Sequence, residues 1–199
     1  MSSVFKGDTP PGFSRRQALG QVARLLGLSL SVTALNALAG GYQPQAGRPN
    51  RTGHVFDGVQ MIAAAALVEV ILPETETPGA AALDVHGFMD YYLHHCESED
   101  VQAGIRRLLS ALDEAAADHK AFALLDADQQ RHLVVALEAG SAPFSVAEAV
   151  FFSTFKKLTV FGYYTSEVGA NEALAYLPIP GGYDGDFTFP AIGKAWSLN

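Results

Sequence analysis

Apolar residues recur at intervals of three and four between residues 57 and 72, and this spacing predicts a helix with one buried face. The stripe consists of Val59, Ile62, Ala63, Ala66, Leu67, Val70 and Ile71. Pro73 follows the stripe directly. Because proline has no backbone N–H and clashes with the preceding turn, we expect the helix to end there.

The same periodicity predicts further helices over residues 84–96, 99–120, 126–139 and 145–161. Asp84 and Asp126 stand at positions where a side chain caps a helix start, and Gly140 stands where a glycine ends one. The candidate core is Leu67, Ile71, Phe88, Leu108, Leu109, Leu133, Phe151 and Phe155. Each of these residues lies on the apolar side of its predicted helix.

The pattern changes after residue 161. Pro178, Pro180, Gly181, Gly182 and Pro190 exclude regular structure from the tail over residues 171–199. The tail nevertheless holds several aromatic residues, which a disordered segment would lack. No strand pattern or internal repeat is present. We therefore expect an all-α domain over residues 56–199, a compact bundle of about five to six helices with an irregular, aromatic-rich C-terminal arm.

The N-terminal 39 residues have the layout of an export signal. Arg15 and Arg16 open an apolar run that contains one further charge, and the run closes with Ala37 and Ala39 in the A-x-A pattern of signal peptidase sites. Leu19 stands three places after the second arginine, as in the twin-arginine (Tat) signal, whose common form has Phe in place of Ala18.

Two other interpretations of this segment remain open. The run over residues 19–38 is long enough for an uncleaved membrane span, although it contains Arg24 and several polar residues. It could also be an ordinary amphipathic helix. Under the export interpretation, residues 40–55 are a flexible linker rich in Gly, Pro and Gln, and the protein is periplasmic.

Charge and composition narrow the classes of partner. The chain has a formal net charge of −8, and removing residues 1–39 takes away four basic residues and one acidic residue, which leaves −11. This excludes nucleic acid and an anionic membrane surface as expected partners. A fraction of 49% apolar against 17% charged residues suggests apolar surface hidden against another protein. The single cysteine, Cys96, excludes an internal disulfide and is interpreted as a buried thiol.

The sequence holds no motif for catalysis or for a cofactor. Nucleotide-binding glycine loops and zinc or haem-attachment spacings are absent. His94 and His95 are neighbours, and adjacent residues on a helix point in different directions, so they cannot converge on one metal ion unaided. Glu69, Glu74 and Glu76 with Asp84 could form an acidic cluster for acid–base chemistry, but the sequence shows no pocket for one, and they are interpreted as solvated acids. We therefore expect no catalytic, cofactor-binding or metal-binding residues in this chain. Since Tat signals suit folded, cofactor-bearing cargo, the cofactor is expected in a partner chain.

Six stretches of the chain occur in an order that resembles the gluconate 2-dehydrogenase subunit 3 family. They are Ala65–Pro73, Glu76–Gly79, Val85–Tyr91, Phe151–Thr159, Gly162–Glu167 and Pro180–Gly185, within a resemblance that covers roughly residues 56–196. The resemblance implies a small, non-catalytic subunit. In that family it pairs with a large FAD subunit of the glucose–methanol–choline (GMC) oxidoreductase class, and it often carries that subunit across the membrane. A cytochrome c subunit often takes the electrons.

The leading hypothesis is thus a subunit that stabilises a sugar or polyol dehydrogenase and escorts it to the periplasm through the Tat translocase. We expect Tyr163, Tyr164, Tyr183, Phe187 and Trp196 at the contact with the flavin subunit, because aromatic residues with polar tips are favoured at interfaces. The alternatives are a stand-alone periplasmic enzyme or ligand-binding protein, and a membrane-anchored adaptor with an uncleaved N-terminal helix.

Overall fold

The computed structural model describes residues 42–45, 48, 51–116, 121–175 and 193–195. Its elements in chain order are α3 (Gly58–Ile71), α4 (Val85–Cys96), α5 (Glu99–Ala115), the 3-10 turn η1 (Phe122–Leu124), α6 (Ala127–Glu138), α7 (Val146–Tyr164) and the π-helical turn η2 (Gly169–Ala173). Over these residues the protein is a helical bundle without a β-sheet, which confirms the predicted all-α class. Residues 1–41 and the arm residues 176–192 and 196–199 lie outside the description.

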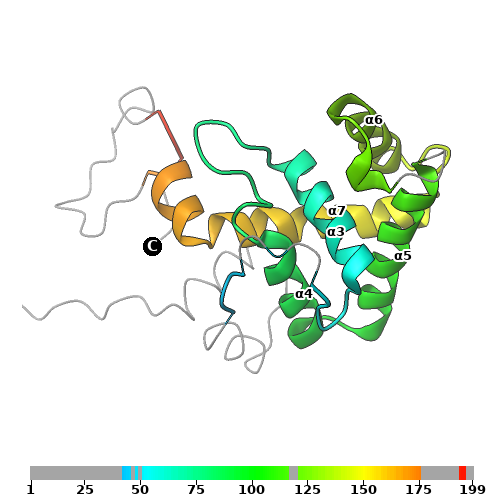
Figure 1. Cartoon of the computed structure of the whole chain (residues 1–199), viewed down its shortest axis with the longest axis horizontal. Helices are drawn as coiled ribbons and strands as arrows, with labels where there is room; N and C mark the ends of the chain where they lie inside the picture. Colours follow the sequence, from blue (N-terminus) through cyan, green and yellow to red (C-terminus); the bar gives the residue numbers. More distant parts are fainter. Residues whose placement is uncertain (1–41, 46–47, 49–50, 117–120, 176–192, 196–199) are drawn as a thin grey trace, which may run out of the picture.

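The long helix α7 organises the bundle. It packs against α3, α4, α5 and α6, and Figure 1 shows it running across the molecule behind α3. Phe155 and Leu158 on its inner face are fully buried. Of the predicted core, Leu67, Leu108, Leu109 and Phe155 are buried, and Ile71, Phe88, Leu133 and Phe151 are partly buried and pack against the same cluster. These eight residues therefore belong to the core or border it, as predicted. The stripe predicted for α3 was wrong at Val59 and Ile62, which are exposed, because the helix turns Met61, Ala64 and Val68 toward the core instead.

Local capping fixes most helix starts. Asp126 accepts the Gln129 N–H at 2.8 Å while the Gln129 side chain returns to the Asp126 backbone, so the predicted cap is confirmed as a full capping box. Gly140 ends the same helix with a φ of +59°, as predicted. Ser145 and Asp57 make equivalent boxes at α7 and α3. These starts depend on residues at most three positions apart, which is why the sequence revealed them.

Two predicted helix limits were wrong. Helix α5 ends at Ala115, short of the predicted residue 120. Helix α7 extends three residues beyond the predicted end at residue 161. Gly162 lies inside this last turn, where a Cβ atom would stand 2.8 Å from the Phe88 ring. The missing side chain lets α4 approach closely, and packing of α4 over the turn outweighs the low helix propensity of glycine.

The cap predicted for Asp84 was also wrong. Asp84 adopts a left-handed conformation with a φ of 57°, and its side chain makes no capping hydrogen bond to α4. The carboxylate turns instead toward the chain before α3. The two oxygens accept hydrogen bonds from the phenol of Tyr42, from the Gln45 N–H and from the Arg51 guanidinium. A residue predicted to start a helix therefore ties down a remote segment.

Candidate functional site

Among the described residues, the buried carboxylates Asp84 and Asp90 and the buried His86 lie on or just before α4, where the segment before α3 meets this helix. Asp84 is 1% exposed and forms an ion pair with Arg51 at 2.8 Å, through a guanidinium that is itself largely shielded. Burial and the hydrogen bond to Asp84 raise the pKa of the Tyr42 phenol, which keeps that hydroxyl a donor. A carboxylate enclosed in this way is stabilised only while its donors stay in place.

A second buried carboxylate, Asp90 on α4, holds the next part of the same segment. Asp90 is 3% exposed and accepts the backbone N–H groups of His54, Val55 and Phe56 at 2.6, 2.9 and 2.8 Å. A Cβ atom at Gly53 would stand 2.4 Å from this carboxylate, so glycine is required for the close approach. The described residues of the predicted flexible linker are thus anchored to the bundle. In the sequence, the only sign of these two anchors was the presence of Asp84 and Asp90 in and just before an otherwise largely apolar stretch.

His86 lies inside this polar region without a hydrogen bond from either ring nitrogen. Its side chain is 4% exposed, and its Nε2 stands 3.3 Å from Asp84 Oδ1. Burial lowers the pKa of His86 to about 4, an effect that the Asp84 carboxylate opposes and the Arg51 charge reinforces. The ring is therefore neutral at pH 7. Because the ring is buried and neutral, we interpret His86 as a core residue.

Tyr163, predicted at the partner interface, is instead a buried residue of the fold. It is 5% exposed, and its hydroxyl lies 2.8 Å from Thr77 Oγ1 and donates to the Pro78 carbonyl at 3.1 Å. The helix continues through this position and directs the ring inward, so Tyr163 holds the loop after α3 and leaves only a small part of its surface for a partner. Sequence reasoning missed this because it ended α7 too early.

Tyr164 remains available at the surface. It is partly exposed and packs edge-on against Tyr163, with ring centres 5.2 Å apart. It lines an open groove together with Leu72, Pro73, Thr75, Glu76, Thr77, Tyr163, Glu172, Ala173, Gly193 and Lys194. Lys194 donates to the Glu172 carbonyl at 2.5 Å, and Ala175 N–H donates to the Ala195 carbonyl at 2.7 Å. The described parts of the arm, residues 171–175 and 193–195, therefore meet beside this groove. Tyr183, Phe187 and Trp196 lie outside the described residues.

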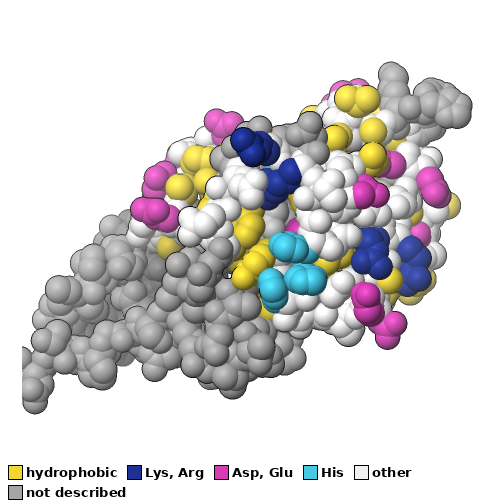
Figure 2. All heavy atoms as spheres, turned by 60° about the horizontal axis from the view of Figure 1, so that its bottom comes forward, with side chains coloured by type: hydrophobic (Ala, Val, Ile, Leu, Met, Phe, Trp, Pro, Cys, Tyr) yellow, Lys and Arg dark blue, Asp and Glu magenta, His cyan; other side chains and the backbone are white. Residues whose placement is uncertain are grey.

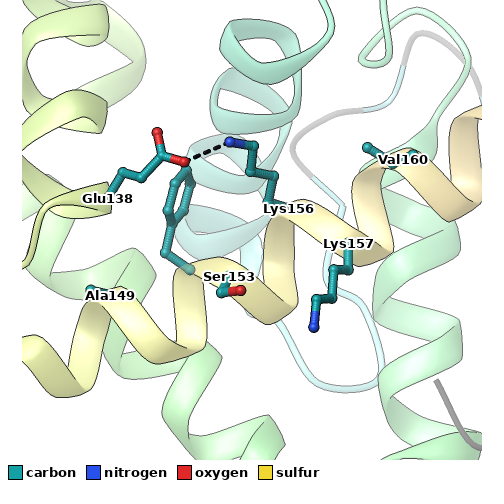
Figure 3. Close-up of a pocket in the computed structure, with 7 residues that line it drawn as sticks. Glu138, Ala149, Ser153, Lys156, Lys157 and Val160 are labelled. Carbon is teal, nitrogen blue, oxygen red and sulfur yellow. Dashed lines mark hydrogen bonds and ion pairs between the residues drawn. The ribbon is translucent and has the colours of Figure 1, made fainter. Parts of the chain in front are cut away.

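A second groove lies between α6 and α7. It is lined by Glu138, Ala149, Phe152, Ser153, Lys156, Lys157 and Val160. In Figure 3, Lys156 points toward Glu138, with which it forms an ion pair at 2.6 Å, and Lys157 points away from it. Exposed pairs of this kind contribute at most ~1 kcal/mol to folding. Val146 and Val150 of α7 are also more than half exposed, so this face offers apolar area to a partner.

In the described part of the chain, no cluster of three or more His, Cys, Asp or Glu side chains is arranged to hold a metal ion. Glu69 is partly buried and accepts the N–H groups of Glu74 and Ala81, each at 3.0 Å, so it braces the loop after α3. The prediction of solvated acids was therefore wrong for Glu69, and also for the buried Asp84. Burial raises the pKa of the Cys96 thiol to about 12, so this thiol is a poor nucleophile.

None of the described helices combines the length and apolarity of a membrane span. The export-signal residues Arg15, Arg16, Leu19, Ala37 and Ala39 lie outside the described residues.

Comparison with known proteins identifies the family. The chain matches no curated protein and no solved structure. A family model described as gluconate 2-dehydrogenase subunit 3 matches residues 59–181, which is more than half of the chain. The match includes nearly all of α3 and every later described helix up to η2. The chain therefore belongs to the gluconate 2-dehydrogenase subunit 3 family, a family of subunits of a dehydrogenase complex.

Proposed function

We propose that this protein is the non-catalytic small subunit of a periplasmic dehydrogenase, and that it binds, stabilises and exports a large FAD-dependent subunit of the GMC class. The observation that carries the proposal is the family match over residues 59–181. The twin-arginine pattern at Arg15 and Arg16 supports the export role, since that route accepts folded cargo. FAD then belongs to the partner, and a cytochrome c subunit is a further expected member of the complex.

The proposed contact with the flavin subunit includes the groove beside Tyr164. Tyr183, Phe187 and Trp196 belong to the same proposal on sequence grounds alone. Tyr164 offers a partly exposed aromatic face with a polar hydroxyl, at a place where the arm returns to the bundle. Aromatic side chains with these properties bury a large area at little cost in conformational entropy. An anchor of this kind typically contributes ~2 kcal/mol or more to binding.

Purification of the full chain, tagged at its C-terminus, from its own cell tests the proposal. We expect a larger chain to co-purify in near-equal amount and to give the absorbance spectrum of bound FAD. Tyr164→Ala should reduce the recovered flavin at least about tenfold, which corresponds to ~1.4 kcal/mol. Lys157→Ala in the other groove is the matched control and should leave recovery unchanged. Recovery of this chain alone would overturn the subunit role, whereas loss only in Lys157→Ala would move the contact to α6 and α7.

Export is tested separately with Arg15→Lys and Arg16→Lys together. This double change keeps both charges but removes the guanidinium pair that a receptor reads. We expect the variant and its flavin partner to fold and to accumulate together in the cytoplasm. Normal delivery to the periplasm would exclude the twin-arginine route while leaving the subunit role intact.

A further inference from the structure

The Asp84 anchor, the set of contacts that Tyr42, Gln45 and Arg51 make with this carboxylate, lies very close along the chain to the predicted end of the export signal. The phenol of Tyr42 donates to the buried Asp84 carboxylate, which also accepts the Gln45 N–H at 2.6 Å. The export interpretation places the cut after Ala39, so only two glycines separate the scissile bond from Tyr42. The chain is therefore attached to the folded bundle at the third residue after the predicted cut.

Several contacts that depend on particular side chains hold Tyr42 in place. Its ring packs edge-on against Phe88, with ring centres 5.8 Å apart. The Arg51 guanidinium donates to the Tyr42 hydroxyl at 2.9 Å and to Asp84 at 2.8 Å. A Cβ atom at Gly87 would overlap both the guanidinium and the phenol oxygen, so glycine leaves the space that these two groups occupy. Tyr42 is therefore bound in a fitted contact on the bundle.

We propose that the Asp84 anchor limits the rate at which the N-terminal signal is removed, and that cleavage proceeds mainly when the anchor opens. This inference rests on the export role proposed above. An extended chain advances at most ~3.6 Å per residue, so the three steps from Tyr42 back to Ala39 span at most ~11 Å. A signal peptidase binds extended residues on both sides of the scissile bond. While the anchor is closed, Tyr42 and the hydrogen-bonded backbone of Gln45 cannot enter its active site.

The Asp84 anchor can open while the rest of the fold stays in place. The Asp84 side chain makes no capping hydrogen bond to α4, so release of Tyr42 leaves the start of this helix unchanged. The second anchor, at Asp90, holds the chain from His54 onward, 15 residues after the predicted cut. There the His54 ring also stacks on His94, with centres 4.9 Å apart, and Figure 2 shows histidine side chains gathered on the surface. Cleavage of a segment held in this way follows the population of the locally open state.

Cleavage of the purified full-length chain by a bacterial signal peptidase in detergent tests the inference, with N-terminal sequencing to identify the product. Six added residues, alternating Gly and Ser, between Gly41 and Tyr42 move the scissile bond away from the bundle and keep every anchor contact. We expect this insertion to raise the cleavage rate at least about fivefold, and Arg51→Met and Asp84→Asn, which weaken the anchor, to do the same. Asp90→Asn, which weakens the second anchor, is the matched control and should be cleaved at the native rate. Circular dichroism establishes that each variant is folded.

A peptide of residues 30–50, which lacks the bundle, separates the anchor from the sequence around the cut. It should be cleaved equally fast with and without the insertion. The inference is overturned if the insertion accelerates the peptide as much as the full chain, if neither Arg51→Met nor Asp84→Asn is cleaved faster than the native chain, or if Asp90→Asn is accelerated as much as they are. Absence of a product that begins at Gly40 would also overturn it. Co-purification of a flavin chain tests the subunit role independently of all these outcomes.

Discussion

Asp84 and Asp90 anchor neighbouring parts of one segment to the same helix, but they use different kinds of donor. Asp84 is held mainly by side chains, the Tyr42 phenol and the Arg51 guanidinium, together with one backbone N–H. Asp90 is held by three consecutive backbone N–H groups, from residues 54–56. Both carboxylates are almost completely buried.

The two anchors differ in how strongly they depend on particular side chains in the segment before α3. Any residue except proline supplies a backbone N–H, so the Asp90 anchor requires little beyond the carboxylate and the space left by Gly53. The Asp84 anchor requires Tyr42 and Arg51 specifically. Removing Arg51 would leave a buried charge with fewer partners, whereas removing Asp90 would leave several donors unpaired at once.

Loss of the Asp90 carboxylate is expected to have the largest effect. Asp90→Ala should lower the free energy of unfolding by about 3–5 kcal/mol, because three N–H groups lose a charged acceptor beside the buried Phe56. Urea denaturation followed by circular dichroism measures this change. Asp128→Ala is the control, since that side chain is 92% exposed, and it should cost no more than about 0.5 kcal/mol. Equal midpoints for the two variants would contradict the anchoring role.

The effects of changing Arg51 and Asp84 on the free energy of unfolding should be coupled, because the two side chains form an ion pair. Asp90 has no such side-chain partner in its anchor. Arg51→Met is expected to cost about 2–3 kcal/mol, at the low end for a buried pair because the arginine is 16% exposed. In the Asp84→Asn background the same change should cost clearly less, since no carboxylate charge is left without its partner. Asparagine also tolerates the left-handed backbone at position 84. Strictly additive effects in this double-mutant cycle would show that the ion pair contributes nothing.

His86 should make the Asp84 region sensitive to acid. Its pKa is lowered from about 6.5 to about 4 by burial, so between these values the unfolded chain binds more protons and stability falls as the pH falls. From pH 7 to pH 5 this contribution amounts to about 2 kcal/mol. Neither ring nitrogen of His86 makes a hydrogen bond, so His86→Leu breaks none. The variant should not show the loss of stability that protonation of His86 causes in the native chain. Urea midpoints at both pH values measure the difference, and parallel pH profiles for native and variant chains would refute it.

The smallest effect is expected where the anchor is neutral. Tyr163 ties the loop after α3 through its hydroxyl, which contacts Thr77 and the Pro78 carbonyl. Tyr163→Phe keeps the buried ring and should cost about 0.5–1.5 kcal/mol, the usual contribution of uncharged hydrogen bonds. Thermal unfolding is sensitive enough to detect this change. A loss as large as that of Asp90→Ala would mean that formal charge is not what separates the strong anchors from the weak one.

The sequence by itself determined the existence of the helices, the caps of α6 and the family. Helix α6 illustrates the reason, since Asp126, Gln129 and Gly140 specify its two ends through contacts within a few residues. The buried face of α5 followed from its spacing, whereas in α3 the spacing failed at Val59 and Ile62, which are exposed. The ordered stretches between residues 65 and 185 were enough to suggest the family that the match over residues 59–181 shows. The export signal and the flavin partner remain proposals drawn from the same sequence and its family.

Only the tertiary structure decided how distant residues meet. Local sequence could not show that Asp84 turns away from its own helix toward Arg51, or that Asp90 collects the N–H groups of a segment interpreted as a flexible linker. Nor could it show that Gly162 lets α7 continue, which buries Tyr163 and leaves Tyr164 at the surface. The meeting of His54 with His94, 40 positions later, has the same origin. These contacts depend on the packing of whole helices, and the spacing of residues along one segment carries no information about the groups that another segment places opposite it.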